Sequence, residues 1–304
     1  LVLDIILMVE GSRKMINRLF GNYLVEKQIL SQDQLDDLLP VRKEFKAEVA
    51  TIAVINKVLS PTAARNLLEQ IDQGNERFGD AAIEAGYLSD EKLDEILGYQ
   101  TNNFMKFVQN LLDGGMFSLD QINPFLDEFQ QLGGYSDAQI SSLIHDDLGE
   151  CINIFVPVRS EQLKEFTLTL VQTLRRLIDS DTYLDKAYTA RSLQLDKYAC
   201  QMVAGDMHMK VYISAPDDNL LAIANYFTED TYDAVDEDAL DNVGEFINCV
   251  NGLFATNLSY DDITIDMNSP EYSMDGPFIS NENLYVLPIH ANGCSFRAIL
   301  EVYE

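Results

Sequence analysis

The sequence predicts two domains, an all-α helical-repeat domain followed by an α+β domain with a mostly antiparallel sheet. Three observations support this fold class. The chain has 304 residues, and a domain takes roughly 100–200. A pattern recurs every 29 residues in the first half. Beyond about residue 149 the spacing of apolar residues includes strand-like alternation. We therefore predict a helical-repeat domain over 15–148 and the α+β domain over 149–304, with residues 1–14 a tail of uncertain origin.

The composition narrows the classes of partner. The chain carries 50 acidic and 21 basic side chains, a formal net charge of -29. Such a charge repels phosphate backbones and anionic lipid, so we expect neither nucleic acid nor a membrane surface as the main partner. No apolar run reaches the ~18 residues of a membrane span.

The cysteines and histidines are few and widely spaced. No C-x-x-C pair occurs among the four cysteines, and the three histidines lie far apart in the sequence. This spacing argues against a metal site. Without an export signal, we predict free thiols and a cytoplasmic protein.

Four serines mark the repeat. Ser31, Ser60, Ser89 and Ser118 follow one another at intervals of 29 residues, and an apolar residue precedes each. We predict that each serine is the N-cap of the second helix in a helix–turn–helix unit. Gly86 and Gly115 would supply the turn. One unit cannot bury its apolar stripe alone, so the units are expected to stack. A partial further copy begins near residue 134.

The third unit has the most complete pattern, with Arg77, Gly79, Gly86 and Gln100 at its characteristic positions. It resembles the repeats in the N-terminal domain of type II secretion and pilus-assembly ATPases. Some members of that family bind cyclic di-GMP through two adjacent copies, and the resemblance implies these four residues as nucleotide-binding positions. The first two units depart from the pattern. We therefore predict a protein-docking or spacer role for the repeats, with a cyclic di-GMP sensor as an alternative.

The second domain begins with a helix and continues with strands around a long helix. Gly205-Asp206 and Asn292-Gly293 are typical of hairpin turns. The predicted helices span 161–178, 217–227 (capped by Asp217 or its neighbour) and 236–258. The predicted strands span 198–203, 209–213, 263–265, 284–287 and 296–300.

The long helix has one polar and one apolar face. At ~100° per residue, four polar-face residues fall within a sector of about 60°: Asp241, Glu245, Asn248 and Gly252. The apolar residues cluster opposite: Val243, Phe246, Ile247, Val250, Leu253 and Phe254. Gly244 borders the polar row. Each glycine costs roughly 1 kcal/mol of helix propensity relative to Ala, which favours a face that another protein approaches closely.

This pattern, D-x-x-x-E-x-x-N followed by Pro270, resembles the signature of the CheC and CheX phosphatases of bacterial chemotaxis. These proteins hydrolyse the aspartyl phosphate of the response regulator CheY. The resemblance covers about residues 150–304. A single motif points to the CheX branch, which implies a homodimer and a phosphorylated CheY-like regulator as partner.

The residue types suit that reaction. An aspartyl phosphate is already activated, so its hydrolysis needs an oriented in-line water and charge stabilisation. We predict that Asn248 orients the water and that Glu245 engages a lysine of the regulator. Asp241, Gly244 and Gly252 are predicted to dock the partner. The protein is expected to carry no cofactor of its own, with Mg²⁺ in the regulator's site.

The same spacing occurs a second time in the chain, at Asp146, Glu150 and Asn153. We predict that this copy is incidental, because it runs into a strand-like stretch ending at Pro157, which would break a helix. The main alternative to a phosphatase is a non-catalytic adaptor that binds a response regulator or a flagellar motor component. Such an adaptor would bind the phosphorylated regulator without shortening its lifetime.

Overall fold

The computed structural model describes residues 15–39, 45–71, 77–145, 147–156, 160–228 and 230–303. The predicted tail, Asp146 and Pro157 lie outside these ranges. The chain forms two compact units, which divide between residues 146 and 147. One is all-α and the other combines helices with an antiparallel sheet, which confirms the predicted fold class. Within the described ranges, no helix has both the length and the apolarity needed to cross a bilayer.

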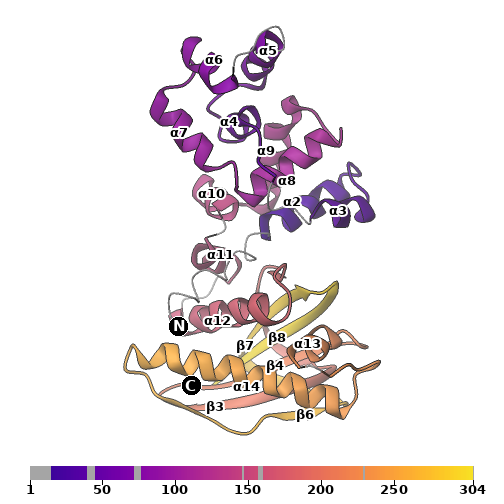
Figure 1. Ribbon diagram of the computed structural model, residues 1–304. Coiled ribbons are helices and arrows are strands. Elements are labelled where there is room, and N and C mark those ends of the chain that lie inside the picture. The colour runs from indigo at the N-terminus through magenta and orange to yellow at the C-terminus, as the bar shows by residue number, and fades with distance from the viewer. Residues whose placement is uncertain are drawn as a thin grey trace. The chain divides into compact units, whose positions relative to one another are not determined.

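The N-terminal unit consists of short helices arranged in successive pairs (Figure 1). They are α2 (Met15–Glu26), α3 (Gln32–Leu38), α4 (Val49–Ile55), α5 (Pro61–Ile71), α6 (Phe78–Glu84), α7 (Asp90–Gly98), α8 (Asn103–Asp113), the 3-10 helix η2 (Leu119–Gln121), α9 (Ile122–Gly133) and α10 (Asp137–His145).

The repeated serines stand at the starts of the second helices. The hydroxyls of Ser31, Ser60 and Ser89 each accept a hydrogen bond, at 3.2 Å, from the backbone N–H three residues later. Ser118 precedes η2, and its backbone N–H donates to the Gln121 side chain at 2.9 Å. Ser136 caps α10 in the same manner. The predicted N-caps Ser31, Ser60 and Ser89 are therefore confirmed, and Ser136 of the partial further copy caps its helix too, whereas Ser118 begins η2 and Gln121 is the N-cap of α9.

The turn of each unit places one residue in the left-handed region, three residues before the serine. These residues are Gln28, Lys57, Gly86 and Gly115, with φ between 55° and 74°. The turn thus keeps its backbone even in the two units that lack the glycine. Gly79 has a different role, because a Cβ there would lie 2.8 Å from the Leu93 side chain. It permits close packing of the two helices of the third unit.

Gly86→Ala is expected to destabilise the N-terminal unit by about 1 kcal/mol, because an L-residue with a left-handed backbone is strained. Apart from the adjoining residues, no atom of the described ranges lies within 4 Å of a Cβ placed at Gly86, so the backbone alone causes the loss. Gly98 is the matched control: a Cβ there also meets open space, and its φ is not positive. Gly98→Ala should stabilise α7 by up to about 1 kcal/mol. Urea denaturation followed by circular dichroism measures both, and equal effects would contradict this account.

The C-terminal unit contains helices α11 (Leu148–Phe155), α12 (Glu161–Leu177), α13 (Leu221–Phe227) and α14 (Glu237–Ser259). Its strands are β1 (Tyr183–Leu184), β2 (Tyr188–Gln194), β3 (Lys197–Gly205), β4 (His208–Ala215), β5 (Ile265–Met267), β6 (Glu271–Ser273), β7 (Phe278–Ala291) and β8 (Cys294–Tyr303).

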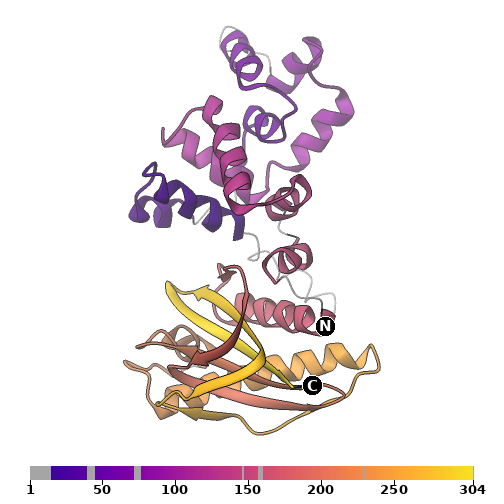
Figure 2. The same ribbon diagram turned by 180° about the vertical axis from the view of Figure 1, so that it is seen from behind.

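The sheet has the order β1-β7-β8-β4-β3-β5, with β2 also paired to β7 and β6 to β3; every described pairing is antiparallel. Helices α12 and α14 lie across one face of the sheet (Figure 1), and the view from behind shows the strands in front of them (Figure 2). The core lies between these layers. Phe254 of α14 meets Phe166 of α12 edge to face at 5.4 Å between ring centroids, which anchors the long helix.

Most predicted elements of this unit are confirmed, including both hairpin turns and the long helix. Asp236 caps α14 by accepting from the Ala239 N–H at 2.9 Å. The helix predicted over 217–227 starts later than expected, because α13 begins at Leu221. Asp217 has a left-handed backbone, with φ at 50°, and Asp218 accepts from the Val235 N–H instead of capping the helix. All four cysteines are free, as predicted.

Candidate functional site

The outer face of α14 carries the predicted site residues. Asp241 and Glu245 are exposed, whereas Asn248 and Gly252 are partly buried. The opposite face is buried in the core, as expected, except at Leu253. That side chain is 45% exposed, because it lies only about 80° around the helix from Glu245. The prediction that Leu253 belongs to the buried face was therefore wrong.

A buried glutamine of β3 holds Asn248 from the side of the sheet. The Gln201 Nε2 atom donates to Asn248 Oδ1 at 2.7 Å and also to the Asn268 carbonyl oxygen at 2.7 Å. Gln201 Oε1 accepts from Asn251 Nδ2, again at 2.7 Å. Gln201 is 1% exposed and Asn251 is fully buried, so these bonds lie where water does not compete with them. Sequence analysis missed Gln201; its one signal was a polar amide within an otherwise apolar strand.

Gly244 has an explanation within its own chain. A Cβ at this position would lie 3.0 Å from the Pro270 Cβ, and Gly244 itself is buried. The glycine therefore permits the segment around Pro270 to pack against α14. The role of Gly244 in docking a partner stays a prediction. The same packing brings the Asn268 carbonyl to Gln201.

Gly252 is different, because outside its own helix backbone and its chain neighbours no described atom lies within 4 Å of a Cβ placed there. The fold does not require a glycine at this position, so Gly252→Ala should stabilise the protein by up to about 1 kcal/mol through helix propensity. If the missing side chain serves a partner, the same substitution should weaken partner binding. Thermal unfolding and a binding titration measure the two effects. Lower stability would show that the helix needs this glycine for its own packing.

Cys249 follows Asn248 on the helix and is partly buried. Burial raises the pKa of its thiol, and the positive charge of Arg176 only partly offsets this. The thiol is therefore protonated near neutral pH, the form that does not act as a nucleophile. Cys249 is therefore not suited to act as a nucleophile on this face.

The four residues of the third repeat lie in the other unit. Gly79 and Gly86 serve helix packing and the turn, as described above. Gln100 donates through Nε2 to the Ala47 carbonyl at 3.1 Å, and its own carbonyl accepts from the Ala47 N–H. Arg77 is exposed at the N-cap of α6. Three of the four therefore have roles within the fold.

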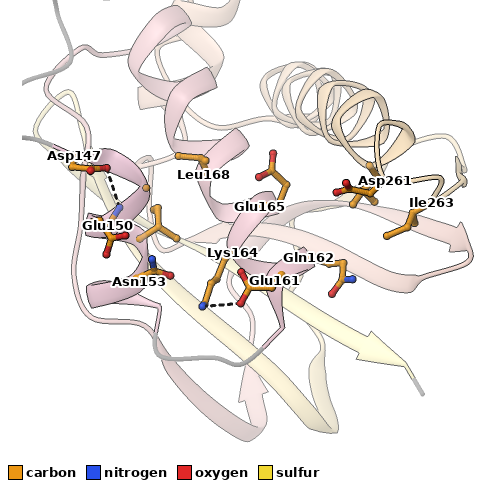
Figure 3. Close-up of a pocket in the computed structure, with 13 residues that line it drawn as sticks. Asp147, Glu150, Asn153, Glu161, Gln162, Lys164, Glu165, Leu168, Asp261 and Ile263 are labelled. Carbon is orange, nitrogen blue, oxygen red and sulfur yellow. Dashed lines mark hydrogen bonds and ion pairs between the residues drawn. The ribbon is translucent and has the colours of Figure 1, made fainter.

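Glu150 and Asn153 of the second copy lie on a helix, and this helix continues through Ile154 and Phe155, so the prediction that these two residues are strand-like was wrong. Glu150 and Asn153 are exposed on α11. They line a pocket of about 330 Å³ formed with α12 and the end of α14 (Figure 3). Its described carboxylates are those of Asp147, Glu150, Glu161, Glu165 and Asp261, and its one cation, Lys164, pairs with Glu161 at 3.0 Å.

This pocket lacks the arrangement found around Asn248. Within the described ranges, no residue donates a hydrogen bond to the side chain of Asn153. Neither Glu245 nor Asn248 lines the pocket. The two copies of the motif thus share a spacing but differ in their surroundings.

Comparisons with known proteins bear on the C-terminal unit. The family model of the chemotaxis phosphatase CheX matches residues 198–290, a span that contains the long helix, Gln201 and Pro270. No curated protein matches the chain significantly.

Among solved structures, chemotaxis protein CheX from Desulfovibrio desulfuricans is 19% identical and has a TM-score of 0.41; the match covers 47% of this chain and 100% of that chain. A CheC-like superfamily protein from Shewanella sp. PV-4 is 18% identical over 48% of this chain and 100% of that chain, with a TM-score of 0.43. The match to the CheX–CheY–BeF3–Mg complex from Borrelia burgdorferi is 18% identical over 48% and 100%, with a TM-score of 0.36. On the family match, the C-terminal unit of this chain carries a CheX-type domain.

Proposed function

We propose that the C-terminal unit hydrolyses the aspartyl phosphate of a CheY-like response regulator. The observation that carries this proposal is the pair formed by exposed Glu245 and partly buried Asn248, one turn apart on the outer face of α14. Both residues lie within the span matched by the model of the chemotaxis phosphatase family. An exposed carboxylate beside an oriented amide offers one group for docking and one for chemistry.

In the proposed reaction a water attacks the phosphorus in line with the bond to the aspartate oxygen. That bond breaks, and the products are the free aspartate and inorganic phosphate. Asn248 positions the water by a hydrogen bond, as an amide side chain does in GTPases. Glu245 pairs with a lysine of the regulator and sets the docking register. The regulator's own Mg²⁺ would stabilise the charge on the phosphoryl oxygens.

The docking face extends along α14 from Asp241 to Gly252. Both residues lie at least partly open to solvent on the side of Glu245. We also propose that the protein is cytoplasmic and forms a homodimer. The open edge of β2 supports the homodimer, since within the described ranges β2 pairs only with β7 and an unpaired strand edge favours association. Light scattering on the full chain measures the oligomeric state.

The experiment that tests the function measures the half-life of the phosphorylated regulator with and without this protein. The host's own CheY-like regulators, phosphorylated chemically, are the substrates. A shorter half-life supports the phosphatase. Binding of the phosphorylated regulator with an unchanged half-life would instead indicate the adaptor.

A further inference from the structure

The orientation of the Asn248 amide follows from a single backbone oxygen. The Asn268 carbonyl oxygen can only accept a hydrogen bond, and it lies 2.7 Å from the end of the Gln201 side chain. That end must therefore be the NH₂ group. The O and N atoms of an amide side chain are hard to tell apart by themselves. Here the Asn268 carbonyl determines which end of the Gln201 amide is which.

The same NH₂ group faces Asn248. Since it has a second proton to donate and lies 2.7 Å from the Asn248 amide, the Asn248 atom that it meets must be Oδ1. The other end of Gln201 is then Oε1, which accepts from Asn251 Nδ2 at 2.7 Å. Reversing any one of these amides would set two donors or two acceptors against each other. Among the described residues, Asn251 Oδ1 is buried and has no hydrogen-bond partner, so the bond to Gln201 is what holds that side chain.

We infer that Gln201 is a positioning residue that holds Asn248 with its Nδ2 group turned away from the sheet. This inference rests on the proposed phosphatase function. Oδ1 has two lone pairs, and the bond to Gln201 turns this oxygen toward the sheet, so the group that Asn248 presents to the regulator is the Nδ2 donor. Asn248 therefore acts on the attacking water by donating to its oxygen, which leaves the water's other lone pair directed at the phosphorus. Pro270, packed against Gly244, holds the segment that carries the Asn268 carbonyl.

The first test is Gln201→Met, which removes the amide while keeping a side chain of similar size. Without Gln201 the Asn248 amide can rotate, so we expect kcat to fall by about tenfold or more. KM should not change, because the exposed docking face is untouched. The matched control is Gln109→Met in the N-terminal unit. Gln109 is also buried, 4% exposed, and accepts from the Thr51 hydroxyl at 2.6 Å. The Gln109→Met variant should have the parental kcat and KM.

The second test is Asn248→Asp, a substitution at a partly exposed site of almost unchanged size. A carboxylate can still accept from Gln201 but offers no donor to the water. A donor role predicts loss of activity by about a hundredfold or more. An acceptor role predicts that the carboxylate retains activity, and that result would overturn the inference. If circular dichroism shows that Gln201→Met does not fold, Asn248→Asp still tests whether Asn248 acts on the water as a donor.

The outcomes separate the inference from the function on which it rests. A parent protein that leaves the regulator's half-life unchanged would overturn both. An active parent, an inactive Asn248→Ala and a folded Gln201→Met with parental kcat would overturn the positioning role alone. Loss of kcat in Gln201→Met and in Asn248→Asp, with Gln109→Met unaffected, supports it.

Discussion

Replacing Asn248 with alanine is expected to lower the rate of regulator dephosphorylation by about a hundredfold or more. The substitution removes a side chain of α14 that is held by the buried Gln201 and is also partly open to a partner. Loss of a single preorganised hydrogen-bond donor costs about 10²–10³ in rate where it has been measured in other enzymes. Folding should survive, because Gln201 keeps its bonds to Asn251 and to the Asn268 carbonyl; the lost bond costs about 1 kcal/mol.

Single-turnover decay of the phosphorylated regulator measures this effect, with thermal unfolding recorded in parallel. The chain provides its own control in Asn153→Ala. Asn153 occupies the equivalent position in the second copy of the motif but is exposed on α11, outside the Gln201 network. The Asn153→Ala variant should dephosphorylate the regulator at the parental rate. Decay with Asn248→Ala as fast as with the parent would refute the assigned role of this residue.

The second large effect is expected for Glu245→Lys. If Glu245 pairs with a lysine of the regulator, the reversed charge sets two cations against each other. The loss of one member of a buried interface pair costs about 2–5 kcal/mol, so kcat/KM should fall by about a hundredfold, mainly through KM. Glu245 is exposed and has no hydrogen-bond partner within the described ranges, so the fold should be unaffected.

A titration of the regulator at two salt concentrations measures this change. Added salt screens exposed charges, so it should weaken docking of the parent and have less effect on the variant. Glu150→Lys, at the matching position of the second copy, is the control and should dock normally. An unchanged KM for Glu245→Lys would show that the carboxylate does not contact the regulator.

Local patterns were sufficient to predict the repeats and the long helix. The spacing of Ser31, Ser60 and Ser89 identified three N-caps, since a capping bond joins residues only three apart. The same principle located Asp236 at the start of α14. The start of α13 was misplaced, because Asp218 bonds to Val235, which lies 17 residues away, and no local rule anticipates that contact.

Within the site, too, local patterns predicted some features and only packing determined the others. The sequence alone determined that Glu245 and Asn248 share one face of a helix, because helical periodicity is a property of neighbouring residues. Only the tertiary structure decided that Gly244 faces Pro270 and that Gln201 reaches Asn248. Gln201 and Asn248 are 47 residues apart, and their contact depends on how β3 packs beneath α14. The direction of the Asn248 amide is therefore a consequence of packing, which the order of residues along the helix does not reveal.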